Sequence, residues 1–223
     1  MKSFLISVLI LFSFVPHSYA MPIISTFDVD DEGWMTEVDK ETIAYESIGG
    51  NPGGFLSLTD LYWAETASTF PPSKFKGDLF DFDGGILSYD LIVIEKHPPL
   101  TQLGGIGRIQ LNGGGSNATF DYTLLPNTPI PSSQSWTTYH VPMTASAWHT
   151  TQENWEKVLS DVTYSDIILD IGDQGTFGLD NFKIEPIIPE PATLSLLGLG
   201  LFGLMIKKKR SENLDQSLLF PKK

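Results

Sequence analysis

Short apolar blocks separated by glycine- and proline-rich turns limit this chain to few folds. The apolar residues within each block alternate with polar ones or run together, which is typical of strands rather than helices. The blocks cover residues 55–59, 86–94, 107–111, 118–122, 137–141, 167–171 and 179–184, and turn clusters lie at 49–54, 83–85, 112–115 and 126–131. Many short strands with such dense turns predict an all-β fold, a single β-sandwich of the jelly-roll type.

One segment between these blocks has a helical pattern instead. Thr150 and Glu153 have the spacing of a capping box, in which each side chain bonds the backbone amide of the other residue. An apolar face at i, i+3, i+4 and i+7 follows, made by Trp155, Val158, Leu159 and Val162. We expect one short helix that closes one end of the sandwich.

The first 20 residues have the organisation of a secretory signal peptide. Lys2 provides the charged start, residues 4–15 are uncharged and strongly apolar, and Ser18-Tyr19-Ala20 has small residues where signal peptidase reads them. The apolar run is short for a bilayer span, which needs about 20 residues. We therefore predict a signal peptide at 1–20, cleavage after Ala20 and export of the domain that begins at Met21.

Residues 189–223 have the features of a second targeting segment. Pro189-Glu190-Pro191 precedes an uncharged stretch at 192–206, and a basic cluster comes after it, made by Lys207, Lys208, Lys209 and Arg210. As a helix this stretch measures about 22 Å, and Ile187 and Ile188 with snorkelling lysines extend it toward the ~30 Å hydrocarbon core. Cations hold their side of a membrane helix in the cytoplasm. We predict a transmembrane helix at 192–206 and a cytoplasmic tail at 211–223.

Together, the Pro-Glu-Pro motif, the short Leu- and Gly-rich stretch and the basic cluster at 189–210 resemble the PEP-CTERM sorting signal of Gram-negative bacteria. The resemblance implies recognition by an exosortase, a membrane cysteine transpeptidase, with cleavage near the motif. It also implies attachment to the cell envelope, the outer surface or an exported polysaccharide matrix. The 13-residue tail departs from the pattern, since such signals normally stop soon after the basic cluster. A permanent single-span anchor is the alternative, and it predicts the same topology.

The remaining domain, residues 21–188, is strongly acidic. It holds seven of the 14 basic and 24 of the 27 acidic residues, a net charge of −17. Nucleic-acid binding is disfavoured because it depends on cations that neutralise phosphates, and an anionic lipid surface repels such a domain. The chain has no cysteine, which removes disulfides and thiolate chemistry. A domain of this size buries a core without covalent links.

A second resemblance covers residues 27–184. The segments that carry it succeed one another along the chain: Phe27, Glu32-Gly33-Trp34, 49–56, 71–78, 87–91, Trp148, 155–159 and 178–182. This order resembles the laminin IV (laminin B) domain, a β-sandwich related to galactose-binding-like jelly rolls. The resemblance implies an extracellular structural or adhesive module, and it names no catalytic residues.

The sequence lacks the motifs of known enzyme classes. The three histidines of the exported part, His97, His140 and His149, do not have metal-ligand spacing, and no Gly-x-Ser-x-Gly elbow is present. The glycine runs lack the lysine of a phosphate-binding loop. We predict that the protein is not an enzyme.

Two acidic residues are candidates for a structural calcium site. Asp28 lies near the start of the domain and Asp180 lies in its last predicted strand. First and last strands are commonly neighbours in jelly rolls related to carbohydrate-binding modules, and Ca²⁺ prefers carboxylate and carbonyl oxygens. The alternative is that the acidic run around Asp28 is a solvated turn and that Asp180 accepts a hydrogen bond from a nearby backbone amide.

Sugar binding requires exposed aromatic side chains, and Tyr62 and Trp63 are the candidates because polar residues adjoin them. The other tryptophans of the domain lie in patterns that predict core positions: Trp34, Trp136, Trp148 and Trp155. The sequence therefore predicts an exported, non-enzymatic structural or adhesive envelope protein in contact with exopolysaccharide. A carbohydrate-binding module for a specific glycan is the second hypothesis, and an envelope hydrolase is the third.

Overall fold

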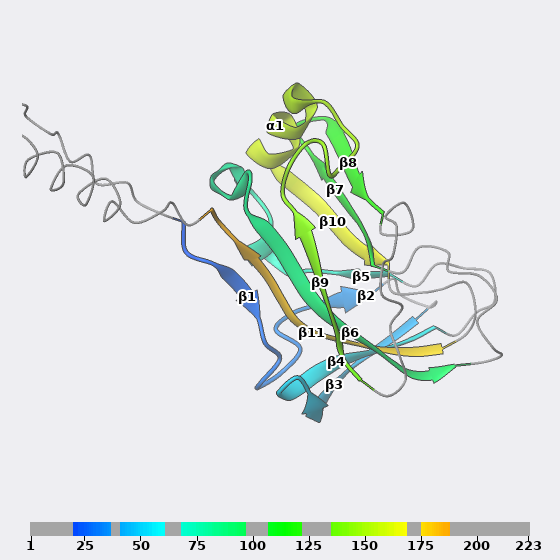
Figure 1. Ribbon diagram of the computed structural model, residues 1–223. Helices are drawn as coiled ribbons and strands as arrows, with labels where there is room; N and C mark the ends of the chain where they lie inside the picture. The colour runs from blue at the N-terminus through cyan, green and yellow to red at the C-terminus, as the bar shows by residue number, and fades with distance from the viewer. Residues whose placement is uncertain are drawn as a thin grey trace, which may run out of the picture. The chain divides into compact units, whose positions relative to one another are not determined.

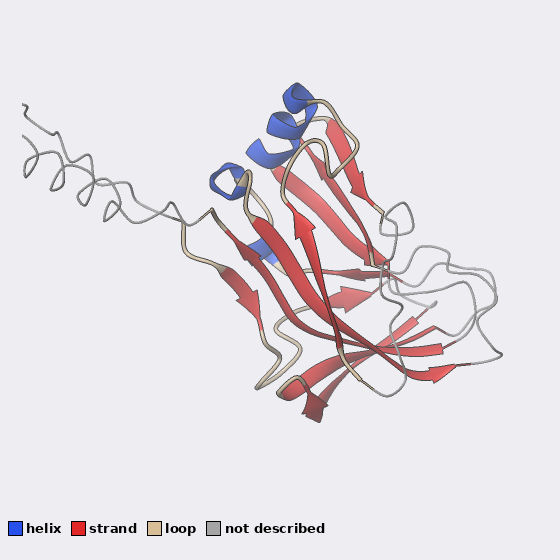
Figure 2. Ribbon diagram, viewed as in Figure 1, coloured by secondary structure: helices blue, strands red, loops and turns tan. Residues whose placement is uncertain are grey.

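The described part of the chain folds into two antiparallel sheets and one short α-helix, as Figures 1 and 2 show. This computed structural model describes residues 20–36, 41–60, 68–96, 107–121, 135–168 and 175–187. The predicted all-β sandwich with one short helix is confirmed. The signal peptide up to residue 19, the sorting motif, the predicted transmembrane helix at 192–206 and the tail at 211–223 lie outside the described residues.

The larger sheet has six strands in the order β3-β4-β11-β6-β9, with β1 on the same edge of β11 as β4. Its strands are β1 (Ile23–Ser25), β3 (Glu41–Gly50), β4 (Gly53–Asp60), β6 (Ile86–Lys96), β9 (Thr137–Pro142) and β11 (Gly175–Glu185). β4 pairs with the first part of β11 and β1 with its last part, so the first and last strands are neighbours as predicted.

The smaller sheet has five strands in the order β2-β5-β10-β7-β8. They are β2 (Met35–Thr36), β5 (Ser68–Phe70), β7 (Arg108–Gly113), β8 (Ser116–Phe120) and β10 (Val162–Ile168). Two 3-10 turns, η1 (Ser73–Phe75) and η2 (Phe80–Phe82), lie between β5 and β6. The β4–β5 connection carries the chain from one sheet to the other, as a sandwich requires.

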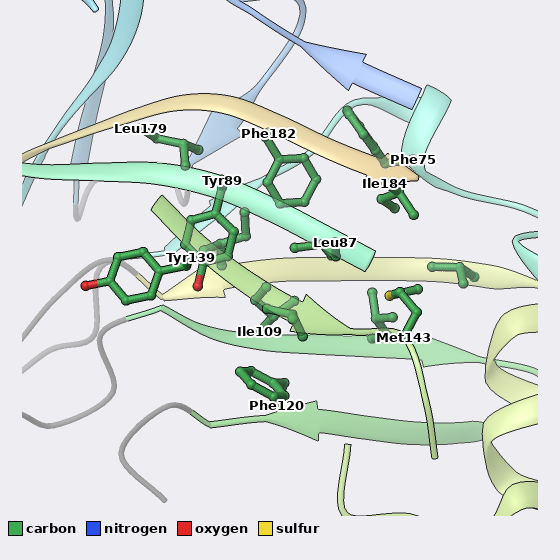
Figure 3. Packing of buried hydrophobic residues seen from close by; sticks show 14 of the residues in the cluster. Phe75, Leu87, Tyr89, Ile109, Phe120, Tyr139, Met143, Leu179, Phe182 and Ile184 are labelled. Carbon is green, nitrogen blue, oxygen red and sulfur yellow. The ribbon is translucent and has the colours of Figure 1, made fainter. Parts of the chain in front are cut away.

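The core lies between the sheets and is rich in aromatic side chains, several of which Figure 3 shows. Alternate residues of β6, including Leu87 and Tyr89, point into it, which is the period of two of a strand. The residues between them, Ser88 and Asp90, are also buried, on the other side of the sheet. Tyr89 and Tyr139 stack with ring centroids 5.5 Å apart, and Phe75 packs edge-on against Phe182 at 4.9 Å. Burial raises the pKa of Tyr139.

The helix α1 (Gln152–Ser160) packs against β7 and β8 and buries Trp155, Val158 and Leu159. Its N-cap is Thr151, whose side chain accepts a hydrogen bond from the Asn154 amide at 3.3 Å. The prediction of Thr150 as the cap is therefore wrong by one residue. Glu153 does not reach back; it pairs with Lys157 at 2.7 Å.

Within the part of the chain that the structure describes, no helix has the length and apolar character needed to cross a membrane.

Candidate functional site

The outward side of the five-stranded sheet carries a row of polar and aromatic side chains on β7 and β10, which we call the outer face. Ile109 and Leu111 of β7 are buried in the core, so Arg108, Gln110 and Asn112 project to the opposite side. The register places Gln110 beside Asp166 of β10 and Asn112 beside Tyr164. The outer face is defined by Phe70, Arg108, Gln110, Asn112, Tyr164 and Asp166.

Two aromatic rings form one part of the outer face. Phe70 of β5 and Tyr164 of β10 lie with ring centroids 5.5 Å apart, and Tyr164 is 38% exposed. The Tyr164 hydroxyl lies 3.4 Å from Oδ2 of Asp166. An accessible ring next to hydrogen-bonding groups is the combination that stacks on the apolar side of a sugar while polar groups bind its hydroxyls.

The neighbouring charged groups have hydrogen-bonding capacity that the described residues leave unused. Asp166 is 9% exposed, and its buried Oδ1 has no hydrogen-bond partner among the described residues; the same holds for the buried Nε of Arg108. Burial raises the pKa of Asp166, although the Tyr164 hydroxyl and the Arg108 charge act in the opposite direction. Buried polar atoms normally have partners, so a ligand whose binding shifts these side chains enough to reach the two atoms would supply hydrogen bonds that the free domain lacks.

The residues predicted to bind calcium lie near one another at a second site, on the edge of β11 between the segments that pair with β4 and with β1. The ladder is interrupted here by a bulge, and Asn181 has a positive φ of 50°. Oδ2 of Asp180 accepts a hydrogen bond from the backbone amide of Asn51 at 2.5 Å, and Oδ1 accepts one from the backbone amide of Asn181 at 2.7 Å. The β3–β4 turn is thus tied to the last strand, and Asp180 is completely buried. The predicted alternative, a hydrogen bond from a nearby backbone amide, is present.

Asp90 of β6 completes this group, which we call the acid–amide cluster: Asp28, Asn51, Asp90, Asp180 and Asn181. Oδ2 of Asp90 accepts from the side-chain amides of Asn51 at 3.0 Å and Asn181 at 2.9 Å. Asp28 is exposed and accepts from the Thr26 hydroxyl at 2.8 Å. Burial raises the pKa of Asp180 to about 6, and the charges of Asp90 and Asp28 add to it against the two backbone hydrogen bonds.

The donor chemistry of the acid–amide cluster suits Ca²⁺, which prefers carboxylate and amide oxygens. Among the residues the structure describes, however, no three His, Asp or Glu side chains come close enough together to hold a metal ion. The carboxylate of Asp28 lies against Gly53 and that of Asp180 lies against Gly50, so both side chains line the β3–β4 turn. Side-chain carboxylates alone therefore do not form a complete site there, and backbone carbonyls would have to supply the other ligands.

The other predicted site residues divide into two groups. Tyr62 and Trp63, in the chain between β4 and β5, lie outside the described residues, as do Pro189–Pro191 and the basic cluster of Lys207, Lys208, Lys209 and Arg210. Of the tryptophans predicted to be core, Trp34, Trp148 and Trp155 are at most 2% exposed, whereas Trp136 is only half-buried and donates to the Gly49 carbonyl at 3.0 Å.

Sequence reasoning missed the outer face. The signal that could have found it is the polar alternation of Arg108, Gln110 and Asn112 between buried neighbours in one short strand. The partner residues on β10 lie more than 50 positions away in the chain, and no local pattern pairs the two strands.

Comparison with known proteins confirms the sorting signal and the jelly-roll fold that the sequence predicts. Residues 188–210 match the family described as the PEP-CTERM protein-sorting motif, which confirms the sorting signal. A search of curated proteins finds no match.

Solved structures of similar shape confirm the jelly-roll fold. The family 30 carbohydrate-binding module of a Clostridium thermocellum cellulosomal cellulase is 15% identical, with a TM-score of 0.51 over 74% of this chain and 98% of that one. An exo-β-agarase is 13% identical, with a TM-score of 0.53 over 74% of this chain and 25% of that one, so the match spans about a quarter of the agarase. The L4b domain of human laminin α-2 also matches, at 14% identity and a TM-score of 0.47 over 69% and 96% of the two chains. Identities this low establish the fold alone.

Proposed function

We propose that this chain is an exported, exosortase-sorted protein of the cell envelope whose sandwich domain binds an extracellular polysaccharide through the outer face. The match of residues 188–210 to the sorting motif carries the export and sorting part of this proposal. The unused hydrogen-bonding atoms of Arg108 and Asp166 beside an accessible tyrosine carry the binding part. The role is adhesive or structural, and the proposal assigns no catalytic step to the domain.

The chemistry of the outer face fits a sugar chain in three ways. Tyr164 offers an aromatic surface for the apolar side of a pyranose ring. The guanidinium of Arg108 is a donor and the carboxylate of Asp166 an acceptor, so sugar hydroxyls that reach these two groups find complementary partners. Gln110 bonds to Asn112 through its side-chain amide at 3.2 Å and leaves further donors and acceptors at the surface. The family 30 module that shares the fold is named as a carbohydrate-binding module, which supports the same class of ligand.

Loss of polysaccharide binding is the expected result of changing the outer face. We expect Arg108→Ala and Tyr164→Ala each to weaken binding about tenfold or more, because each removes a hydrogen-bonding or stacking contact worth about 1–2 kcal/mol. A glycan array identifies a bound polysaccharide, and affinity electrophoresis then compares the variants. Thr138→Ala, an exposed position on the other sheet, is the matched control.

The same assay includes Trp63→Ala, because Tyr62 and Trp63 were predicted from the sequence to stack on sugars. Binding that is lost in Trp63→Ala but retained in both outer-face variants would transfer the ligand site to residues 61–67. A domain that binds no polysaccharide at all would leave the adhesive role without a glycan partner and contradict this part of the proposal.

Removal of the sorting segment tests the other part. A chain that lacks residues 189–223 is expected to be released from the inner membrane as soluble, full-length mature protein, because it retains the signal peptide but loses the predicted membrane helix and the sorting motif. Cell fractionation and immunoblotting measure the distribution. Glu190→Ala separates sorting from simple anchoring. If an exosortase cleaves the chain, the Glu190→Ala protein is expected to accumulate unprocessed in the membrane. If the segment is a permanent anchor, the unchanged protein and Glu190→Ala will have the same chain length. A truncated chain that stays with the membrane would refute the sorting role.

We also propose that Asp28 and Asp180 hold a structural calcium ion together with backbone carbonyls of the β3–β4 turn. The ion would offset the repulsion of carboxylates gathered beside a buried strand edge. Calcium added to EDTA-treated protein is expected to raise its melting temperature by several degrees, since binding to the folded state alone stabilises it. Asp180→Asn should remove the response, and Asp81→Asn, an exposed acid elsewhere, should keep it. An unchanged melting temperature at millimolar Ca²⁺ rules the site out.

A further inference from the structure

Both ends of the described chain leave the domain at the same place. β1 runs antiparallel to β11, with Ile23 opposite Ile184, and Figure 1 shows β1 beside the C-terminal end of β11. The residues just before β1 and just after β11 therefore emerge at one end of the six-stranded sheet. Signal-peptide removal and sorting would both act on this end of the domain.

Apolar side chains are exposed at this end, and we call three of them the terminal patch: Ile24, Ile86 and Ile187. They are 43%, 45% and 54% exposed. Ile24 pairs with Lys183 and Ile86 with Glu185, which places both on the outward side of the same sheet. Ile187 packs over Gly84, two residues before Ile86, with its Cδ1 2.5 Å from the position that a Cβ of Gly84 would take. Ile187 therefore belongs to the folded domain and does not extend the predicted membrane segment.

The polar groups between these residues are already paired. Lys183 and Glu185 form an ion pair of 2.9 Å between Ile24 and Ile86 on the sheet surface. The two charges between Ile24 and Ile86 thus neutralise each other, although Asp83 adjoins Gly84 and the domain as a whole is strongly acidic. Single exposed apolar residues are ordinary on soluble domains, so the position of these residues along the chain is what gives them meaning.

The chain offers little length between the terminal patch and the uncharged stretch that begins at Ala192. Ala192 lies five residues after Ile187, and a fully extended chain covers at most about 18 Å over that distance. The polar headgroup layer occupies about 5–8 Å of this on each side of a bilayer. The tether therefore limits the terminal patch to within about 10–13 Å of the headgroup surface for as long as the following stretch stays in the membrane.

We infer that the terminal patch is a membrane-contact surface that rests on zwitterionic lipid before the sorting segment is removed. This inference depends on the membrane insertion of residues 192–206 in the proposed function. A short tether produces a high effective concentration, so even a weak apolar contact is populated. Zwitterionic rather than anionic lipid is the partner because the acidic domain is repelled by negative headgroups. The contact presents the Pro-Glu-Pro motif at the membrane surface, where a membrane enzyme works.

A matched pair of single cysteines tests this contact, because the chain has no cysteine of its own. Ile86 and Ile94 both lie on β6, and both are 45% exposed. They are eight residues apart, which separates them by about 26 Å along the strand. Full-length Ile86→Cys and Ile94→Cys proteins are reconstituted into protein-free vesicles of phosphatidylcholine and phosphatidylethanolamine. The rate of reaction with a water-soluble maleimide is measured for each and normalised to its rate in urea.

We expect the Ile86→Cys protein to react with the maleimide about fivefold more slowly than the Ile94→Cys protein in vesicles. Burial of a half-exposed apolar site against lipid shifts the equilibrium toward contact by about this factor. Vesicle flotation is measured on the same samples. Equal rates in protein that floats would overturn the membrane contact and leave the proposed anchoring intact. Protein that fails to float would overturn both. Protection seen only in cell membranes that contain the exosortase would show that a protein, and not lipid, covers the patch, and would also refute the inference.

Discussion

Trp155→Ala is expected to destabilise the domain by about 3–5 kcal/mol, the range for removal of a fully buried tryptophan from a core. Trp155 has no exposed surface, and its ring lies 5.2 Å from that of Trp148. Its Nε1 also donates to Oδ1 of Asp83 at 2.7 Å, which fastens α1 to the residue just after η2. A loss of this size is a large part of the 5–15 kcal/mol of a typical domain. Urea denaturation followed by circular dichroism measures it.

Two further variants separate packing from hydrogen bonding at this position. Trp155→Phe keeps most of the buried area but cannot donate to Asp83, so we expect a smaller loss of about 1–3 kcal/mol. Glu156 is the next residue and lies on the exposed side of α1. Glu156→Ala should therefore change the free energy of unfolding by less than about 0.5 kcal/mol. A Trp155→Ala protein as stable as Glu156→Ala would show that the helix does not close the core.

Gly54→Ala is the second change with a large expected effect, about 3 kcal/mol of destabilisation or a failure to fold. A Cβ at this position would lie 2.3 Å from the carbonyl oxygen of Phe27 and 2.8 Å from that of Glu46. Both contacts are to backbone atoms, which cannot rotate away as a side chain can. The first residues of β4 therefore pass so close to the loop after β1 that only glycine fits. Thermal and urea denaturation of the variant measure the loss.

Gly115→Ala provides the comparison that isolates this close approach. Gly115 lies in the β7–β8 turn at a φ of 75°, and a Cβ there would meet no atom within 4 Å. Only the left-handed backbone conformation is disfavoured, which costs roughly 1–2 kcal/mol. If Gly54→Ala were no more harmful than Gly115→Ala, the contact with Phe27 would not be what requires glycine. Because Gly54 adjoins the turn that carries Asn51, its replacement should also abolish any response to calcium.

The sequence predicts the strands whose two faces differ and misses those whose faces are alike. β7 and β9 alternate between core and surface, and alternation is what the pattern detects. β3 is an edge strand with mostly exposed residues, so Ile43 and Ile48 stand among Glu, Ser and Gly without a clear period. The helix was predicted from Trp155, Val158, Leu159 and Val162, but it ends at Ser160, and Val162 is the first residue of β10. Two consecutive threonines precede the helix. The side-chain contact of Thr151 with Asn154, which selects the cap, exists only in the folded chain.

The sequence likewise predicts some residues of the candidate sites and misses others. Asp28 and Asp180 could be paired from the sequence because the first and last strands of such a fold are neighbours, and β1 does pair with β11. Asp90 was missed because it reaches the acid–amide cluster through the register of β6 with β11, which places it opposite Asp180. The outer face depends on the pairing of β7 with β10 in the same way. Long-range register is a property of the complete sheet, and single segments do not contain it.

The place of β11 in the larger sheet has a consequence for secretion. β11 is the last strand among the described residues, yet it lies inside the sheet, with β6 on one edge and β4 and β1 on the other. The sheet is therefore incomplete until residues 175–185 have crossed the inner membrane, and the strands that await β11 expose edges open to wrong pairing. In the proposed topology the stretch at 192–206 halts translocation just after β11 emerges. The nascent domain would then complete its fold while still attached to the membrane, apart from other copies with which its open strands could aggregate.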